Sequence, residues 1–335
     1  MKKSLLALAA LTAFVGAASA QSSVTLFGIV DVSARNLSAG GVSQQQLATD
    51  GYNSSRLGFR GVEDLGGGMR ASFWYEGSIS ADTGTSAGQT WQRRQTVSLS
   101  GGFGEIRAGR DYTPSFWNST VFDPFGTNGV GSYLNVAQTS LGTGATTYVR
   151  ANNSIGYFLP GGLGGLYGQV MVAAGEGLVA NDYKGFRLGY GAGPMNVAFS
   201  YGKTDTTIIG AYKHVSFGGS YKLGAPTVMA QYNKVDAGSR GQKNMLIGFS
   251  YPMGATEIRG AYTKADATGS IAANDATQMA VGFVQNMSKR TALYGTYARI
   301  SNKGASTFVN GGGLSLGLRT GFNSTGYEVG VRHSF

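Results

Sequence analysis

The chain has 335 residues, of which 55 are glycine and only 6 are proline, and its formal net charge at pH 7 is +10. The many aromatic residues exclude intrinsic disorder, the lack of a regular glycine triplet excludes collagen, and the lack of cysteine excludes disulfides and thiolate metal sites. So basic a chain could bind nucleic acid, but it carries no motif of a known nucleic-acid module. High glycine together with many Tyr, Phe, Val and Thr is typical of a large β protein with tight turns.

The first 20 residues have the three parts of a secretory signal peptide. Two lysines near the start are followed by the apolar run 5–15 and by the small-residue triplet Ala18-Ser19-Ala20. We expect residues 1–20 to be cleaved, which leaves residues 21–335 as one domain. The apolar run is too short for a membrane-spanning helix, and no later run approaches the ~18 residues that such a helix needs. Export also makes nucleic acid an unexpected partner.

Beyond the signal peptide, apolar and polar side chains alternate in segment after segment. Between Val24 and Ala34, for example, one face is apolar while the other carries Asp31 and Ser33. The same period of two recurs in 195–203, 215–223 and 244–251. A period of two over about ten residues is the signature of a β-strand with two unlike faces. The sequence therefore predicts an all-β protein.

The connectors between these segments are of two alternating kinds. Short glycine-rich connectors include 63–68, 101–104, 191–194 and 252–255, and long polar ones include 79–91, 112–149, 265–276 and 302–323. Short turns at one end and long loops at the other are typical of a transmembrane antiparallel β-barrel. Seven short turns predict sixteen strands. The register is ambiguous near 92–95 and 292–300, so a count two higher or two lower is the alternative. A soluble β-sandwich fits less well with a final strand running to Phe335.

Arginine recurs in segments that otherwise suit a membrane. At mid-bilayer, a lipid-facing arginine costs about 2–4 kcal/mol, whereas a lumen-facing one meets water. Alternation turns the apolar residues Leu57, Phe59 and Phe73 outward, so the polar residues between them point inward. The residues expected to line the lumen in these segments are Arg56, Arg60, Arg70, Trp74 and Glu76. By the same rule, Arg94, Arg150 and Asn152 also face inward.

Five blocks of the sequence resemble the general porins of Gram-negative bacteria, of the β-proteobacterial type. These blocks are QSSVTLFGIVDVSAR, SSRLGFRGVEDLGGGMRASFWYEG, RRQTVSLSGGFGEIRAGRD, VRANNSIGY and the terminal YEVGVRHSF. The resemblance extends over essentially the whole mature chain. It implies a sixteen-stranded outer-membrane barrel that assembles as a homotrimer, with short periplasmic turns and long external loops. It also implies that the third external loop, here residues 112–149, folds into the lumen and narrows it.

The resemblance further implies a charged constriction. Matched residue by residue, its basic side would consist of Arg56, Arg93 and Arg150. Strict alternation instead turns Arg94 inward, and a β-bulge near Arg93 would reconcile the two, so both remain candidates. Family members carry a Pro-Glu-Phe-Gly motif in the third loop, whereas this chain reads Asp123-Pro124-Phe125-Gly126. We therefore expect a weakened acidic side, with Asp123 as a pore-lining carboxylate.

These features predict a water-filled, anion-preferring channel for passive diffusion of small hydrophilic solutes and ions across the cell outer membrane. Fixed positive charges at a narrowing raise the occupancy of anions. No cofactor, metal or catalytic residue is expected. The expected partners are two further copies of the chain, outer-membrane lipid and lipopolysaccharide, and small anionic solutes such as phosphate, sulfate or carboxylates.

Three other functions are also compatible with the sequence. The first is a channel specific for one solute. The second is an outer-membrane barrel enzyme, which would need a converging acid–base cluster that His214 and His333 scarcely supply. The third is a structural anchor, which would normally carry a further periplasmic domain.

Simpler roles also stay open for single residues. Arg60 and Arg70 flank a periplasmic turn, where they would only bind lipid phosphates or neighbouring acids. Asp123 would only cap a turn, and Trp74 would only pack on the lumen wall.

Overall fold

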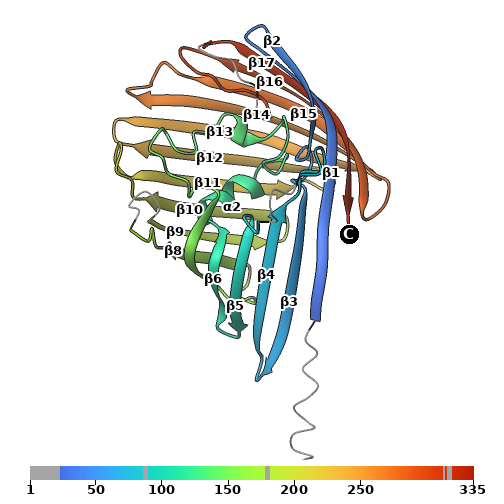
Figure 1. The fold of residues 1–335 in the computed structure, drawn as a ribbon, viewed down its shortest axis with the longest axis vertical. Coiled ribbons are helices and arrows are strands. Elements are labelled where there is room, and N and C mark those ends of the chain that lie inside the picture. The colour runs from blue at the N-terminus through green and yellow to red at the C-terminus, as the bar shows by residue number, and fades with distance from the viewer. Residues whose placement is uncertain (1–22, 86–89, 178–181, 312–313, 315–318) are drawn as a thin grey trace, which may run out of the picture.

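The computed structural model describes residues 23–85, 90–177, 182–311, 314 and 319–335, so the expected signal peptide lies outside the described residues. Figure 1 shows one curved sheet of antiparallel strands that closes on itself. The first segments are β1 (Ser23–Ala39), β2 (Val42–Ala48), β3 (Arg56–Gly66), β4 (Met69–Ser78), β5 (Arg94–Gly101), β6 (Gly104–Tyr112), α2 (Pro114–Val121), the 3-10 helix η1 (Tyr133–Asn135), β7 (Arg150–Phe158) and β8 (Leu166–Ala173). The remaining strands are β9 (Tyr183–Ala192), β10 (Met195–Thr204), β11 (Tyr212–Lys222), β12 (Thr227–Ala237), β13 (Arg240–Met253), β14 (Thr256–Gly269), β15 (Ala276–Asn286), β16 (Thr291–Asn302) and β17 (Asn323–Ser334).

The seventeen β-segments occupy sixteen strand positions. On one side of β1, residues 33–39 pair with β2 and residues 23–29 pair with β3, so β2 and β3 follow each other along a single position. On its other side, β1 pairs with β17, which closes the barrel. The predicted all-β, sixteen-stranded antiparallel barrel is therefore confirmed, and the β-sandwich alternative is wrong.

The connections differ between the two ends of the barrel. At one end the strands are joined by short turns, such as the turn between β3 and β4, where Gly66, Gly67 and Gly68 all have positive φ (78°, 61° and 80°). Three successive residues with positive φ strongly favour glycine, because other residues rarely adopt this conformation. The other end carries the longer loops, although two of its connections in the described part of the chain are short: Gly40–Gly41 between β1 and β2, and Gly238–Ser239 between β12 and β13.

The two faces of the wall differ as the alternation predicts. Large apolar side chains such as Val24, Met279 and Val329 are 68%, 64% and 59% exposed on the outside. Residues of opposite parity, such as Ser33 and Gln231, are buried within the barrel. Among the described residues, no helix is long and apolar enough to cross a membrane.

Candidate pore constriction

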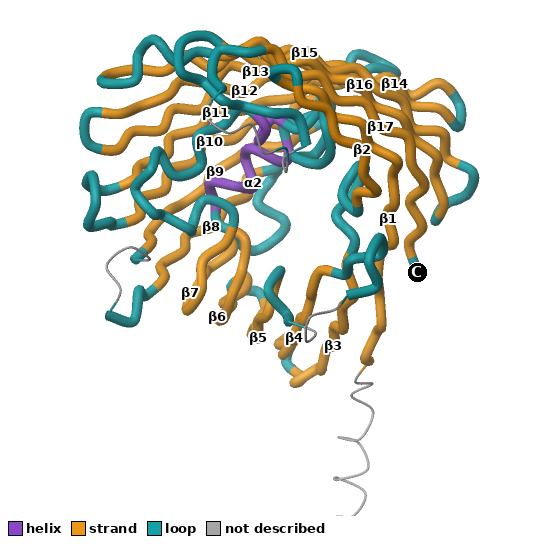
Figure 2. The backbone as a smooth tube through the Cα atoms, turned by 45° about the horizontal axis from the view of Figure 1, so that its top comes forward, coloured by secondary structure: helices purple, strands orange, loops and turns teal. Residues whose placement is uncertain are grey.

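Loop 3, residues 113–149, lies inside the barrel. Figure 2 shows its helix α2 within the ring of strands. The helix is capped by Thr113, whose hydroxyl accepts a hydrogen bond from the Phe116 N–H. Pro114 occupies the first helical position, where a backbone N–H would have no partner within the helix. Inward-facing amide side chains of the barrel hold the rest of the loop. The Gln278 amide, for example, donates to the carbonyls of Gly131 and Ser132 at 2.9 and 3.0 Å.

Further anchors come from neighbouring strands on the same side. The Gln231 amide of β12 donates to the carbonyls of Ser119 and Phe122, and the Gln242 amide of β13 donates to the carbonyl of Val136. These strands lie across the barrel from β4–β6 in the strand order. Loop 3 is therefore fastened to one side of the lumen and faces the wall that carries the candidate arginines.

Asp123 is the only acidic residue of loop 3. Its carboxylate accepts hydrogen bonds from the backbone N–H groups of Phe125, Thr127 and Tyr133 at 2.9, 3.0 and 2.9 Å, and the residue is 3% exposed. Burial raises the pKa of Asp123 to about 6. The carboxylate is thus committed to the fold of the loop, and loop 3 presents no free carboxylate to the lumen.

Glu76 is the centre of the basic cluster on the opposite wall. Its Oε1 accepts a 2.6 Å hydrogen bond from Arg93 Nε and lies 3.4 Å from Arg56 Nη1. Its Oε2 accepts a 3.1 Å hydrogen bond from Trp74 Nε1. One carboxylate therefore positions two guanidinium groups, and a positive excess remains.

Tyr112, at the junction of β6 and loop 3, connects this cluster to the loop. Its hydroxyl accepts hydrogen bonds from Arg93 Nη2 at 3.0 Å and Arg150 Nη2 at 2.7 Å. The Arg150 guanidinium also lies 4.3 Å from the centre of the Tyr112 ring, and that ring stacks on Phe116 of α2. Such cation–π contacts fix the plane of a guanidinium group.

Arg94 belongs to a second group of charges on the same wall. Its guanidinium lies 4.6 Å from the centre of the Trp74 ring, and its Nε is 3.7 Å from Asp111 Oδ1. Arg107 pairs with Asp111 at 2.6 Å and with Glu105 at 3.0 Å. The wall from β3 to β7 thus gathers five guanidinium groups and three carboxylates, namely Arg56, Arg93, Arg94, Arg107 and Arg150 with Glu76, Glu105 and Asp111.

The side chains of Arg93 and Arg94 both point into the lumen at this wall, but for different reasons. Strand β5 begins at Arg94, whose side chain points inward by alternation. Arg93 precedes the strand, so its direction is not bound by the pleat, and no bulge is needed to turn it towards Glu76.

The bulge lies instead between β6 and β7. The register shifts between Gly109 and Asp111, and Asn153 has a φ of 51°. Alternation through this point had turned Asn152 inward. The structure places Asn152 beside Arg110, whose Nη1 donates to it, in a surface hollow that Phe73 and Val97 also line. A bulge shifts the pleat by one residue, which explains the difference.

Arg60 and Arg70 lie away from Glu76. Arg60 is exposed, with its guanidinium 5.5 Å from the Phe27 ring and 5.4 Å from the Trp74 ring. Arg70 is exposed near the turn between β3 and β4, and no ion pair involves it among the described residues. Trp74 therefore packs between Arg60 and Arg94 on the lumen wall.

Sequence reasoning missed Tyr112, Arg107 and Asp111. Alternation along β6 could have found Arg107 and Asp111, because they lie four residues apart on one face. Tyr112 carries no comparable signal, since its role depends on where loop 3 leaves the wall.

Comparisons with known proteins agree with this architecture. The model of the Gram-negative porin family matches residues 7–305. Outer membrane porin protein 32 of Delftia acidovorans is 38% identical over the full length of both chains. The solved structure of an anion-selective porin from Comamonas acidovorans has a TM-score of 0.86 at 36% identity, covering 94% of this chain and 100% of that one. OmpT of Vibrio cholerae, at 13% identity and a TM-score of 0.69 over 94% of this chain and 98% of its own, shares the fold alone.

The closed barrel with its apolar outer face and polar interior, the family match and the full-length relative agree with one another. The chain belongs to the Gram-negative porin family and is an outer-membrane β-barrel that forms a channel for passive diffusion.

Proposed function

We propose that this channel prefers anions, and that the cluster around Glu76 and Tyr112 is the basic side of its constriction. One observation carries the proposal. Five guanidinium groups are matched by only three carboxylates on one wall, while the single acid of the loop facing them is sequestered by backbone N–H groups. Unit charges 4 Å apart interact by about 4 kcal/mol at an effective dielectric constant of 20. Fixed charges of one sign at a narrowing therefore raise the occupancy of the opposite ion.

The arginines suit this role because contacts hold them in place. Arg93 is held by Glu76 and Tyr112, and Arg150 is held by the ring and hydroxyl of Tyr112. Anions would then pass through the electrostatic field of fixed guanidinium groups and would not have to displace flexible side chains. The anion-selective porin from Comamonas acidovorans, which this chain resembles, supports the same preference here.

The proposed assembly is a homotrimer of chains from which residues 1–20 have been removed. A candidate contact surface is the polar patch on the outer wall of β5–β7, which contains Gln95, Arg110 and Asn152. Such groups are costly against lipid, whereas a neighbouring protein chain can bind them. Two other copies of the chain would supply that cover.

The proposed activity is diffusion without turnover. His214 packs edge-on against the ring of Tyr148 at 5.2 Å, and His333 Nδ1 lies 2.9 Å from the Thr291 hydroxyl at the far end of β17. The two imidazoles thus belong to separate parts of the wall. Robust hydrolysis of peptide or lipid substrates by the purified protein would favour a barrel enzyme instead.

The reversal potential in asymmetric KCl tests the anion preference. Purified protein in planar bilayers should pass chloride better than potassium. The double variant Arg56→Gln/Arg150→Gln should shift the reversal potential towards cations, whereas the control Arg70→Gln at the periplasmic rim should shift it much less. An unchanged potential in the double variant would remove the cluster from the selectivity mechanism. Phosphate, sulfate and a small dicarboxylate added to this assay would distinguish a general pore, which none of them blocks selectively, from a solute-specific one.

A further inference from the structure

A row of lysines crosses the outside of the barrel near its loop-bearing end. We call this set the lysine row: Lys184 of β9, Lys203 of β10, Lys213 of β11, Lys234 of β12, Lys243 of β13 and Lys264 of β14. Each lies an even number of positions from exposed apolar residues of the same strand, such as Phe217 for Lys213 and Met245 for Lys243. Successive side chains alternate between faces, so all six lysines point away from the lumen.

Three of these lysines belong to a repeated motif, Tyr-x-Lys-x-Asp. It occurs at Tyr201–Asp205, Tyr232–Asp236 and Tyr262–Asp266, at the loop-bearing ends of β10, β12 and β14. Tyrosine is enriched where a barrel wall meets the membrane surface. The lysine two residues further out on the same face therefore lies at the level of the lipid head groups.

The row places like charges directly opposite one another. Lys203 is the cross-strand partner of both Lys184 and Lys213, and Lys234 is the partner of Lys243. Directly opposed like charges destabilise a sheet unless an anion lies between them. Asp236 lies opposite Lys213 and Asp266 lies opposite Lys243, but each of these aspartates is the ion-pair partner of another lysine. The row therefore keeps a net positive charge, which favours a ligand of negative charge.

The available carboxylates satisfy only half of the row. Lys203, Lys234 and Lys264 each pair with the aspartate two residues along, at 2.5, 2.7 and 2.7 Å. Across the described part of the chain, no carboxylate lies within ion-pair distance of Lys184, Lys213 or Lys243. These three ammonium groups are exposed and alternate with the paired ones.

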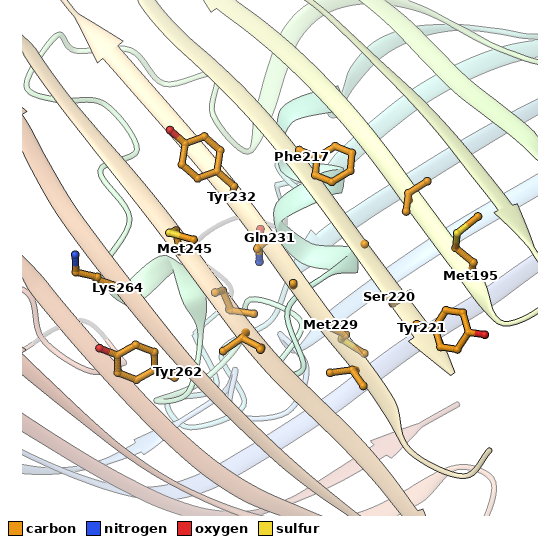
Figure 3. Close-up of a pocket in the computed structure, with 16 residues that line it drawn as sticks. Met195, Phe217, Ser220, Tyr221, Met229, Gln231, Tyr232, Met245, Tyr262 and Lys264 are labelled. Carbon is orange, nitrogen blue, oxygen red and sulfur yellow. The ribbon is translucent and has the colours of Figure 1, made fainter. Parts of the chain in front are cut away.

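An apolar groove of about 770 Å³ lies on the same outer face, directly next to the row. The wall is hollowed here because Gly219 of β11 and Ala230 of β12, both small, lie opposite each other. Figure 3 shows Phe217, Tyr232 and Met245 around it and Lys264 at its edge. A hydrophobic groove that continues into a row of cations fits an amphiphile with apolar tails and an anionic head.

We propose that the outer wall of β9–β14 is a binding site for a phosphorylated, multiply acylated lipid of the outer leaflet, the lipid A part of lipopolysaccharide. Its phosphates lie between Lys184, Lys213 and Lys243 and their opposed lysines, and one acyl chain occupies the groove over Gly219 and Ala230. Each basic residue near an anionic lipid surface adds to the attraction. The site is outside the barrel, so it does not depend on the proposed ion selectivity.

A ligand-induced shift in unfolding temperature tests the site, because a ligand that binds only the folded protein stabilises it. Delipidated protein in neutral detergent is titrated with bisphosphorylated lipid A. The variant Lys184→Gln/Lys213→Gln/Lys243→Gln should need at least about tenfold more lipid for half of the shift. The control Lys222→Gln/Lys289→Gln/Lys303→Gln loses the same charge elsewhere and should titrate like the wild type.

Further measurements test the phosphate contacts and the acyl-chain groove separately. Dephosphorylated lipid A or inorganic phosphate alone should give little shift, and an equal shift from either would overturn the two-part site. Ala230→Leu, which fills the groove, should weaken binding several-fold while leaving the lysines intact. Equal titration of the lysine variant and its control would also overturn the proposal. If the triple variant does not fold, Lys213→Gln and Lys243→Gln are compared singly with Lys222→Gln.

Discussion

The lumen and the outer wall are both basic, but they hold their charge in different ways. Inside, arginines are fixed by carboxylates and aromatic rings, as Arg93 is by Glu76 and Tyr112. Outside, lysines of the lysine row stand exposed, and half of them have no carboxylate partner among the described residues. A planar guanidinium presents fixed donors, whereas an ammonium on a flexible stem follows its ligand. The difference suits a stationary field for moving ions inside and adaptable contacts for a mobile lipid outside.

The largest expected effect comes from removing the carboxylate that fixes the inner cluster. Glu76 and Arg93 have side chains only 5% and 10% exposed. Glu76→Gln leaves two guanidinium groups without their shared partner, so we expect a loss of about 2–3 kcal/mol in the free energy of unfolding. Reversible denaturant unfolding in detergent or lipid measures it.

The matched control for this change is Glu257→Gln. Glu257 also pairs with one lumen arginine, Arg259, at 2.6 Å, but its side chain is 35% exposed. Its loss should cost less than the loss of Glu76, because Glu257 is partly solvated and Arg259, itself 8% exposed, keeps the Pro124 carbonyl and the Tyr52 ring as partners. Equal destabilisation by the two substitutions would show that the Glu76 cluster is no more rigid than an ordinary rim pair. The Glu76 variant should also prefer chloride more strongly than the wild type, because it loses a negative charge.

A smaller effect is expected from the pH dependence of loop 3. The pKa of Asp123 is raised from 3.8 to about 6 in the folded protein, so the folded state binds a proton more readily than the unfolded state. Its contribution to stability is therefore fully present below pH 3.8 and is lost as the pH rises through 6. Between pH 7 and pH 5, the wild type should gain about 1 kcal/mol relative to Asp123→Asn. Unfolding curves of both proteins at the two pH values give this difference directly. The same pH dependence in both would place the titrating group elsewhere.

The sequence predicted the barrel wall well because, within each strand, alternate side chains face lipid and the aqueous lumen. Alternation placed Arg56 and Glu76 on the same inner face, and the structure brings them together at 3.4 Å. That inference needs no knowledge of neighbouring strands, since the pleat alone decides which way a side chain points. The strand count followed from the turns for the same reason.

The rest of the site depends on contacts that are distant in sequence. The direction of Asn152 changes because a bulge forms opposite Gly109, and nothing local in the sequence marks it. The role of Tyr112 and the burial of Asp123 both follow from how loop 3 folds inside the barrel. Whether a loop carboxylate faces water or its own backbone is decided by that fold, which alternation does not describe.

The smallest effect is expected from neutralising lysines on the outer wall, and it tests the difference between the lumen and the outer wall most directly. Neutralising Lys184, Lys213 and Lys243 together should leave the reversal potential of the pore almost unchanged, although it removes more charge than the change at Arg56 and Arg150. The lysines face away from the lumen and lie where salt screens them, with a Debye length of about 8 Å at 0.15 M. Planar-bilayer recordings on the same triple lysine variant provide the measurement.

A shift as large as that of the arginine variant would mean that surface potential around the pore mouth sets the selectivity, not the inner cluster. Salt separates these two causes. In 1 M KCl the Debye length falls to about 3 Å, so a surface effect should vanish. The field of guanidinium groups that ions pass at close range is screened far less. Selectivity that persists in 1 M KCl and is lost only with Arg56 and Arg150 therefore assigns the two basic surfaces to two separate tasks.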